Sequence, residues 1–302
     1  MELTMDWQDQ LITVYLYVCK HYEKNLWVYC QRMSNHVDLS FSDEEVVTLY
    51  LFGIMDKNRE IKQIYKYADR HLRSWFPKLP SYVAFVQRLN RVSEVFAPLL
   101  EIIQVEQEKT RIGDTQSLLI DSFPVALAKQ GHRFKARVAP ELANHGYCST
   151  KKLYFYGVRV HVIGRRQAGT LPSPEYIGVT EGSCHDGNIF DQIRPLLIDE
   201  ELFGDKAYQR SDAKEIQTKQ NLEVLTPVKK QKGQKYLEAD EQLLSTAVSK
   251  VRQPIEALIG WIEEKTGIEC AGKVRSYTGL MVHVFGRLAA AMFFWNKLRV
   301  CS

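Results

Sequence analysis

The stretch SLLIDSFPVALA, residues 117–128, decides the fold, because a run so rich in apolar residues is typical of a buried β-strand. It carries a single acid, Asp121, in its middle. A carboxylate inside a strand that otherwise belongs to the core is costly unless something such as a metal ion compensates it. The stretch therefore predicts a central strand and, at the same time, a candidate metal ligand.

Four further strands and three helices follow in an order that indicates a mixed sheet. Three consecutive strands come first, and helices then alternate with strands, which predicts an antiparallel meander followed by parallel crossovers, with helices on both faces. In such a sheet the first and fourth strands are neighbours at the centre. The predicted strands are residues 117–128, 152–166, 174–182, 201–208 and 222–228, and the predicted helices are residues 186–197, 210–221 and 239–267.

The first third of the chain has helical character. Ser42 occupies an N-cap position, and the acids that follow it suit the first turn of a helix. A helix over about 60–72 carries Lys62, Lys66, Arg70 and Arg73, and another begins at Ser81 and runs to about 104. Short helices with a basic face favour a helix-turn-helix-like module that binds DNA ends, although a packing or dimerisation bundle has the same pattern. We expect a helical domain over 1–110 and a catalytic domain over 111–302.

The composition narrows the class of protein. Of the 302 residues, 45% are hydrophobic and 25% charged, and the net charge of +4 permits a polyanionic partner. Six cysteines without a CxxC pair argue against a zinc finger or a disulfide framework, and favour reduced thiols in a cytoplasmic protein. The start MELTMDWQDQ lacks the basic residues of a secretory signal. The apolar stretch 281–295 is too short for a membrane span, so we expect a buried helix and no membrane partner.

Three acids stand at positions where they could converge. Asp121 lies on the first strand, Asp205 ends the fourth strand directly after Gly204, and Glu256 lies on the long helix between apolar neighbours. Those neighbours place Glu256 near the buried face of that helix, and Gly204 allows backbone or a ligand to approach closely. Hard oxygen ligands of this kind suit Mg²⁺ or Mn²⁺, and two such ions about 4 Å apart support in-line displacement at phosphorus. Taken singly, each acid could equally be a cap, a salt-bridged residue or a solvated one.

Several local sequences resemble those of one enzyme family. LIDSFPVAL, GDKAY, RQPIEALIGWIEEK and VTEGSCHDGNIF, in this strand order, resemble the DDE-type transposases of bacterial insertion sequences, whose catalytic domain is ribonuclease-H-like. The resemblance implies an α/β, ribonuclease-H-like mixed five-stranded sheet flanked by helices and preceded by an all-helical N-terminal domain. It also implies that Asp121, Asp205 and Glu256 are the catalytic and metal-binding residues, with His185, Asp186 and Arg252 as auxiliary residues.

The resemblance implies a function as well. A transposase binds terminal inverted repeats, cleaves the element ends with Mg²⁺ or Mn²⁺, and transfers them into double-stranded target DNA, usually as a homodimer or higher oligomer associated with the bacterial nucleoid. Two features depart from the family. The position seven residues after the catalytic Glu, often Lys in relatives, is Glu263, and the nearest lysine is Lys265. Pro254 inside the long helix predicts a kink or the start of its second half.

Basic residues fall in loops that would border a groove around the acids. Phosphate contacts there would add salt-sensitive affinity for DNA, although lysine-rich loops are also ordinary solvated surface. Tyr147, Tyr154 and Tyr156 could stack on bases, or simply pack on the sheet, which is more common. His161 is interpreted as a strand residue without a chemical role. The candidate DNA-binding residues are Arg133, Lys135, Arg137, Lys151, Lys152, Arg165, Lys206, Lys229 and Lys230.

Two other functions remain open at this point. A ribonuclease-H-like nuclease uses similar acids without joining strands, and an inactive DNA-binding derivative would bind DNA without cutting it. The helical N-terminal domain and the basic loops favour transposition over the nuclease, and the intact set of three acids argues against the inactive derivative.

Overall fold

A computed structural model describes residues 6–31, 39–109 and 116–300, with side chains as far as Trp295. The chain forms two compact units: unit 1 combines Met1–Lys109 with Ile262–Ser302, and unit 2 is Thr110–Trp261. This division differs from the domain boundaries expected from sequence, since the C-terminal residues join the N-terminal helices. The physical reason is that the apolar helix α10 packs on α2 and α5.

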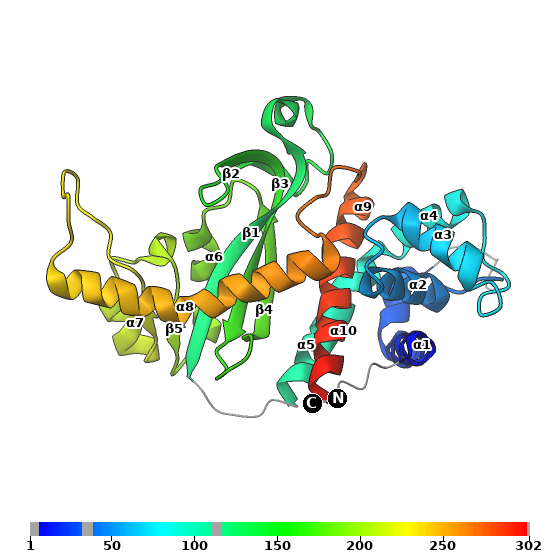
Figure 1. The fold of residues 1–302 in the computed structure, drawn as a ribbon, viewed down its shortest axis with the longest axis horizontal. Helices are drawn as coiled ribbons and strands as arrows, with labels where there is room; N and C mark the ends of the chain where they lie inside the picture. The colour runs from blue at the N-terminus through cyan, green and yellow to red at the C-terminus, as the bar shows by residue number, and fades with distance from the viewer. Residues whose placement is uncertain (1–5, 32–38, 110–115, 301–302) are drawn as a thin grey trace. The chain divides into compact units, whose positions relative to one another are not determined.

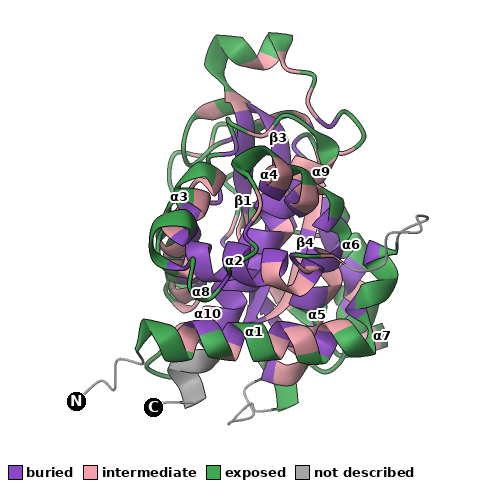
Figure 2. Ribbon diagram, turned by 90° about the vertical axis from the view of Figure 1, so that its right-hand side faces the viewer, coloured by how far each residue is buried: buried purple, intermediate pink, exposed green. Residues whose placement is uncertain are grey.

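Unit 1 is helical, as expected from the sequence. Ser42 caps α2 in a capping box, because the Glu45 amide donates to Ser42 Oγ at 3.2 Å and Glu45 Oε2 accepts from the Ser42 amide. Figure 2 shows α2 buried along most of its length. The elements are α1 (Trp7–Lys24), η1 (Leu26–Cys30), α2 (Asp43–Met55), α3 (Ile61–His71), α4 (Tyr82–Arg91), η2 (Ser93–Val95), α5 (Phe96–Lys109), α9 (Tyr277–Met281), η6 (Val282–Gly286) and α10 (Arg287–Val300).

Two details of unit 1 differ from the sequence prediction. The helix expected from Ser81 to about 104 is divided by the 3₁₀ turn η2 into α4 and α5. The connection between α3 and α4, residues 72–81, is longer than the about three or four residues of a helix-turn-helix turn. The basic face of α3 is present, but this pair of helices lacks that tight turn.

The apolar C-terminal segment is longer than expected. Within the described parts of the chain, Tyr277–Trp295 is the one stretch whose length and composition would allow it to cross a membrane. However, 78% of that stretch is buried inside the protein. The burial is typical of a core helix of a globular unit, and the Tyr50 hydroxyl donates to the Val282 carbonyl at 3.1 Å within it.

Unit 2 is built on a mixed sheet, as predicted, with β1 at its centre. The order is β2-β3-β1-β5-β6, and β4 also pairs with β3. Strand β1 is antiparallel to β3 and parallel to β5, which confirms that the first and fourth predicted strands are neighbours. The sheet has six strands, whereas five were predicted. The prediction missed the short strand β2, NHGYC, because its sequence lacks the apolar alternation that marks a strand. The strands are β1 (Ser117–Lys129), β2 (Asn144–Cys148), β3 (Leu153–Arg165), β4 (Ser173–Glu181), β5 (Glu201–Phe203) and β6 (Glu223–Leu225).

Helices cover both faces of this sheet. On one face Leu118 and Ile120 of β1 form a buried core with Phe190 of α6 (Asp186–Ile193) and Ile216 of α7 (Ala213–Gln220). Alternate residues of a strand point to opposite faces, so Leu119 and Asp121 face the other way, toward α8 (Ala239–Thr266), which crosses the sheet in Figure 1. Helix α8 continues through Pro254, so the expectation that this proline begins a second half is wrong.

Candidate active site

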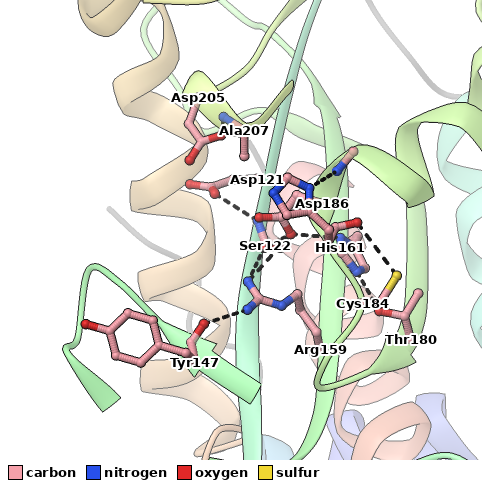
Figure 3. Close-up of polar contacts among 12 residues, drawn as sticks. Asp121, Ser122, Tyr147, Arg159, His161, Thr180, Cys184, Asp186, Asp205 and Ala207 are labelled. Atoms are coloured by element: carbon pink, nitrogen blue, oxygen red, sulfur yellow. Dashed lines mark hydrogen bonds and ion pairs between the residues drawn. The ribbon is translucent and has the colours of Figure 1, made fainter. Parts of the chain in front are cut away.

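The strand register brings Asp121 and Asp205 to the same place. Leu119 of β1 pairs with Phe203 of the parallel strand β5, and each aspartate lies two residues further along its own segment. Strand β5 ends at Phe203, so the neighbouring stretch of β1 has no strand partner on that side. The two carboxylates therefore lie side by side at the end of the β5 ladder, as Figure 3 shows.

Gly204 allows the tight turn that leads into Asp205. The sequence suggested that this glycine lets backbone or a ligand approach closely, but the structure shows a different reason. A Cβ at this position would lie 2.8 Å from the ring of Tyr208. The Tyr208 side chain is fully buried in the core that α6 and α7 share with β1. The glycine thus accommodates a core tyrosine, and the chain turns tightly enough for Asp205 to cap the 3₁₀ turn η5 (Lys206–Tyr208), with its Oδ1 accepting from the Ala207 amide at 2.7 Å.

Asp121 is partly buried, with 19% of its side chain exposed. Its Oδ1 accepts from the Ser122 amide at 2.8 Å, and its Oδ2 accepts from Arg252 Nη2 at 2.9 Å. Burial nevertheless raises the pKa of Asp121 above its ordinary value, and the charge of Asp205 raises it further, while Arg252 and the Ser122 amide oppose the shift. The site thus holds an acid whose negative charge is only partly compensated.

Glu256 occupies a different environment from the one predicted. Its side chain is 59% exposed, so the apolar neighbours did not place it on the buried face of α8. It is linked to the other acids by Arg252, four residues earlier, whose Nη2 lies 3.1 Å from Glu256 Oε1. Because the same nitrogen contacts Asp121, the guanidinium lies between these two carboxylates. Burial disfavours the charged form of Arg252, but the neighbouring acids outweigh it and raise its pKa.

A second polar network lies on the other face of β1. Asp186, the first residue of α6, accepts from Ser122 Oγ at 2.7 Å, and Arg159 Nη1 donates to the same Oγ at 3.1 Å. His161 is fully buried, with its Nδ1 3.7 Å from Asp186 Oδ1 and its Nε2 2.8 Å from Thr180 Oγ1. Burial lowers the pKa of His161 to about 4, although Asp186 opposes the shift. Figure 3 shows this network beside Asp121 and Asp205.

One cleft joins both sets of acids. It has a volume of about 690 Å³ and is lined by Asp121, Asp186 and Asp205, together with Arg159 from β3. Its size lies within the range of about 300–1,000 Å³ that is usual for ligand pockets. The cleft therefore offers hard oxygen ligands and cationic groups in one space, which is the chemistry required to bind metal ions and phosphate.

A divalent metal fits this donor set in part. Asp121 and Asp205 supply adjacent carboxylate oxygens, and the buried charge of Asp121 calls for a cation. However, within residues 6–31, 39–109 and 116–300, no group of three or more His, Cys, Asp or Glu side chains is close enough to hold a metal ion. The third predicted ligand, Glu256, is held by Arg252. A three-carboxylate site would thus require the guanidinium to leave its position.

The predicted auxiliary pair lies at the start of α6, with its roles exchanged. His185 is the N-cap, because its Nδ1 accepts from the Gly187 amide at 3.2 Å. Asp186, which the sequence suggested as a cap, instead turns to Ser122 and Arg159. The helix end also favours an acid in its first turn.

Most of the candidate DNA-binding residues lie at the surface of unit 2. Arg133 lines the cleft, and Lys206 is exposed next to Asp205. Lys135 and Arg137 are exposed in or just after η3 (Gln130–Lys135), and Lys151 and Lys152 are exposed in the turn between β2 and β3. Lys229 and Lys230 are exposed between β6 and α8.

Arg165 is a correction to this set. Only 7% of the residue is exposed. Its Nη1 donates to Glu200 at 2.9 Å, and its Nη2 donates to Glu175 at 2.9 Å. A guanidinium buried against two carboxylates is not available to a DNA phosphate. The sequence placed it in a turn, whereas it closes the β3 strand and stabilises the sheet.

Sequence reasoning missed Arg159, Tyr208 and Ser122. Arg159 carries the same signal that singled out Asp121, since it is a charge within an apolar strand. The Tyr208 hydroxyl is buried without a hydrogen-bond partner in the described part of the chain, and burial together with Asp186, Asp121 and Asp205 raises its pKa. Nothing in the local sequence marks Ser122, whose role depends on the position of α6. The interpretation of His161 as a plain strand residue also overlooked its contact with Asp186.

The family model described as Transposase DDE domain matches residues 112–275, which is more than half of the chain and includes Asp121, Asp205 and Glu256. No curated protein and no solved structure matches the chain significantly.

Proposed function

This chain belongs to the Transposase DDE domain family, and we propose that it cleaves the ends of a bacterial insertion sequence and joins them to target DNA. The observation that carries the proposal is the adjacency of Asp121 and Asp205, two residues beyond the paired ends of β1 and β5. The mixed sheet with helices on both faces supports a ribonuclease-H-like catalytic domain.

We propose Asp121, Asp205 and Glu256 as the catalytic carboxylates and as ligands of Mg²⁺ or Mn²⁺. Such ions, when bound, activate the attacking hydroxyl and neutralise the leaving oxygen of a phosphodiester. The residues of the chain do the remaining work. Arg252 compensates Asp121 and holds Glu256, and Lys206 and Arg159 flank the acids, where they can attract DNA phosphates.

DNA binding is proposed for both units. In unit 1 the exposed Lys62, Lys66 and Arg70 follow one another at helical spacing along α3 and form a basic stripe that suits contacts to the terminal inverted repeats. In unit 2 the exposed lysines and arginines of the surface loops would contact the backbone of the element end or of the target. A homodimer or higher oligomer that holds both ends, acting in the cytoplasm on the nucleoid, completes the proposal.

The test is an assay of cleavage and joining by the full chain. Duplexes that cover the DNA on either side of its own gene are incubated with Mn²⁺ or Mg²⁺, with a labelled target duplex, and joined products are sought. We expect Asp121→Asn, Asp205→Asn and Glu256→Gln each to reduce cleavage by at least about 1,000-fold. Glu215→Gln, an exposed acid on α7 paired with Lys219, is the matched control and should leave cleavage unchanged.

The outcomes separate the possible functions. Cleavage without joined products would identify a nuclease that performs no strand transfer. Binding of the element ends without cleavage would identify an inactive DNA-binding derivative. Cleavage that survives all three acid substitutions would overturn the assignment of the site, and a variant Asp186→Asn would then show whether the neighbouring acid performs the chemistry instead.

A further inference from the structure

Beside the acids lies a group of aromatic side chains that are exposed and not packed into the core. We call Arg133, Phe134, Tyr147 and Tyr154 the aromatic platform. Phe134 is 61% exposed, Tyr154 52% and Tyr147 44%. Single exposed apolar residues are common on protein surfaces, but contiguous exposed aromatic groups that share one cleft mark a binding site. All four residues line the cleft that contains Asp121 and Asp205.

The platform is held in place by strand pairing. Tyr147 of β2 pairs directly with Tyr154 of β3, and their ring centroids are 4.5 Å apart. Arg133, from the 3₁₀ turn after β1, extends over both Tyr154 and Phe134, with its Cζ 4.4 Å from each ring centroid. Tyr147 is anchored further because its carbonyl accepts from Arg159 Nη2 at 2.9 Å (Figure 3). The rings are thus preorganised and remain accessible.

Tyr156, which the sequence grouped with the other two tyrosines, is not part of the platform. It is only 5% exposed, and its hydroxyl donates to the Val138 carbonyl at 3.1 Å. It supports the platform indirectly, because its ring packs edge-on against His145, whose ring centroid lies 6.1 Å from that of Phe134.

The partners of Arg133 differ from those of three arginines in the strands and helix around the cleft. Arg159, Arg165 and Arg252 each contact a carboxylate. In the part of the chain that the structure describes, no carboxylate pairs with Arg133, whose guanidinium instead lies on aromatic rings. A cation on an aromatic surface, with no acid to neutralise it, suits a ligand that combines a flat ring with a negative charge.

We propose that the aromatic platform captures an unpaired base of the DNA strand being processed, with Arg133 contacting the adjoining phosphate. The proposal rests on the proposed function, because it names the part of the DNA that the cleft accepts. Stacking on an aromatic ring requires a base released from its duplex partner. The platform therefore favours DNA ends that are frayed or single-stranded next to the acids.

The experiment compares two fluorescently labelled probes of the same sequence, a blunt duplex and a duplex that ends in a single-stranded fork. The full chain is titrated into each by fluorescence anisotropy, in buffer with a chelator so that no cleavage occurs. We expect the wild-type chain to prefer the fork. Tyr154→Ala and Phe134→Ala should each weaken fork binding by about 5- to 100-fold, and leave blunt-duplex binding within about twofold.

Two control variants sharpen the comparison. Tyr154→Phe keeps the ring and should keep the preference for the fork. Tyr236→Ala removes a tyrosine of the same unit that is 74% exposed and lies beside Lys235, and should change neither affinity. Circular dichroism checks folding, and Phe134→Ala decides the question if Tyr154→Ala does not fold.

The platform proposal is overturned if the platform variants weaken both probes equally, or if neither variant weakens the fork. Its failure is distinguishable from that of the proposed function. If the wild-type chain never cleaves or joins DNA, but the platform variants alone lose the preference for the fork, the platform proposal holds and the transposase proposal fails. If the chain cleaves DNA through the three acids, but the platform variants keep the preference for the fork, the transposase proposal holds and the platform proposal fails.

Discussion

Two clusters of acids and arginines lie on the sheet of unit 2, and they compensate buried charge differently. In the first, which we call the closed cluster, the guanidinium of Arg165 donates hydrogen bonds to both Glu175 and Glu200. Burial disfavours the charged form of Arg165, but these hydrogen bonds outweigh it and raise its pKa. The second cluster lines the cleft and holds Asp121, Asp186 and Asp205, with Glu256 at its edge.

The two clusters differ in how much negative charge remains uncompensated by arginines. The cleft cluster has four acids and two arginines, Arg159 and Arg252, and burial raises the pKa of Asp121 in spite of its arginine. A cluster such as that of Arg165, in which the arginine is shared by two acids, stabilises the fold. A cluster with uncompensated charge, such as that of the cleft, is where a protein can accept a cation or a phosphate. This contrast favours a structural role for Arg165 and supports the chemical role that we propose for Asp121.

The largest expected change in stability comes from opening the closed cluster. Arg165→Ala leaves two partly buried glutamates without their cation, so the free energy of unfolding should fall by about 3 kcal/mol. Urea denaturation measures the change. The control Arg194→Ala removes an arginine from a more exposed pair with Asp212, and should cost less than about 1 kcal/mol. Equal losses in the two variants would contradict the structural role of Arg165.

The second prediction concerns His161, which supports Asp186 from the core. Its folded pKa of about 4 lies below the ordinary value of 6.5, so its neutral form stabilises the fold above pH 6.5, and this contribution is lost as the pH falls toward 4. Between pH 7.5 and 5.0 the wild-type chain should lose about 2 kcal/mol relative to His161→Phe. Denaturation curves at the two pH values test this, and parallel changes in both proteins would show that His161 does not titrate there.

The smallest expected effect has the opposite sign. Because the folded pKa of Asp121 is raised, its stabilising contribution is complete below the unfolded pKa and is lost as the pH rises through the folded pKa. At pH 7 the neutral variant Asp121→Asn should therefore unfold at a slightly higher urea concentration than the wild type, by less than the change in Arg165→Ala. A clear loss of stability would show that the Arg252 contact outweighs the cost of burial.

The success of sequence reasoning followed the range of the interactions involved. The Ser42 cap and the long strands were predictable, because capping and apolar alternation act over a few residues. Strand β2 was missed because its pairing with β3, and not its own composition, defines it. Glu256 was expected on the buried face of α8 but is 59% exposed, since its apolar neighbours describe the helix as a whole and not the direction of one side chain.

By itself, the sequence determined the order of the strands and helices of unit 2 apart from β2, the mixed character of the sheet and the neighbouring positions of Asp121 and Asp205. These features follow from local periodicity and from the topology that it allows. Only the tertiary structure decided that Arg165 is buried between two glutamates, that Arg252 lies between Asp121 and Glu256, and that Tyr147 and Tyr154 form one platform with Arg133. Each of these depends on strand register or helix placement, which join residues far apart in the chain and leave no mark in the sequence around any one of them.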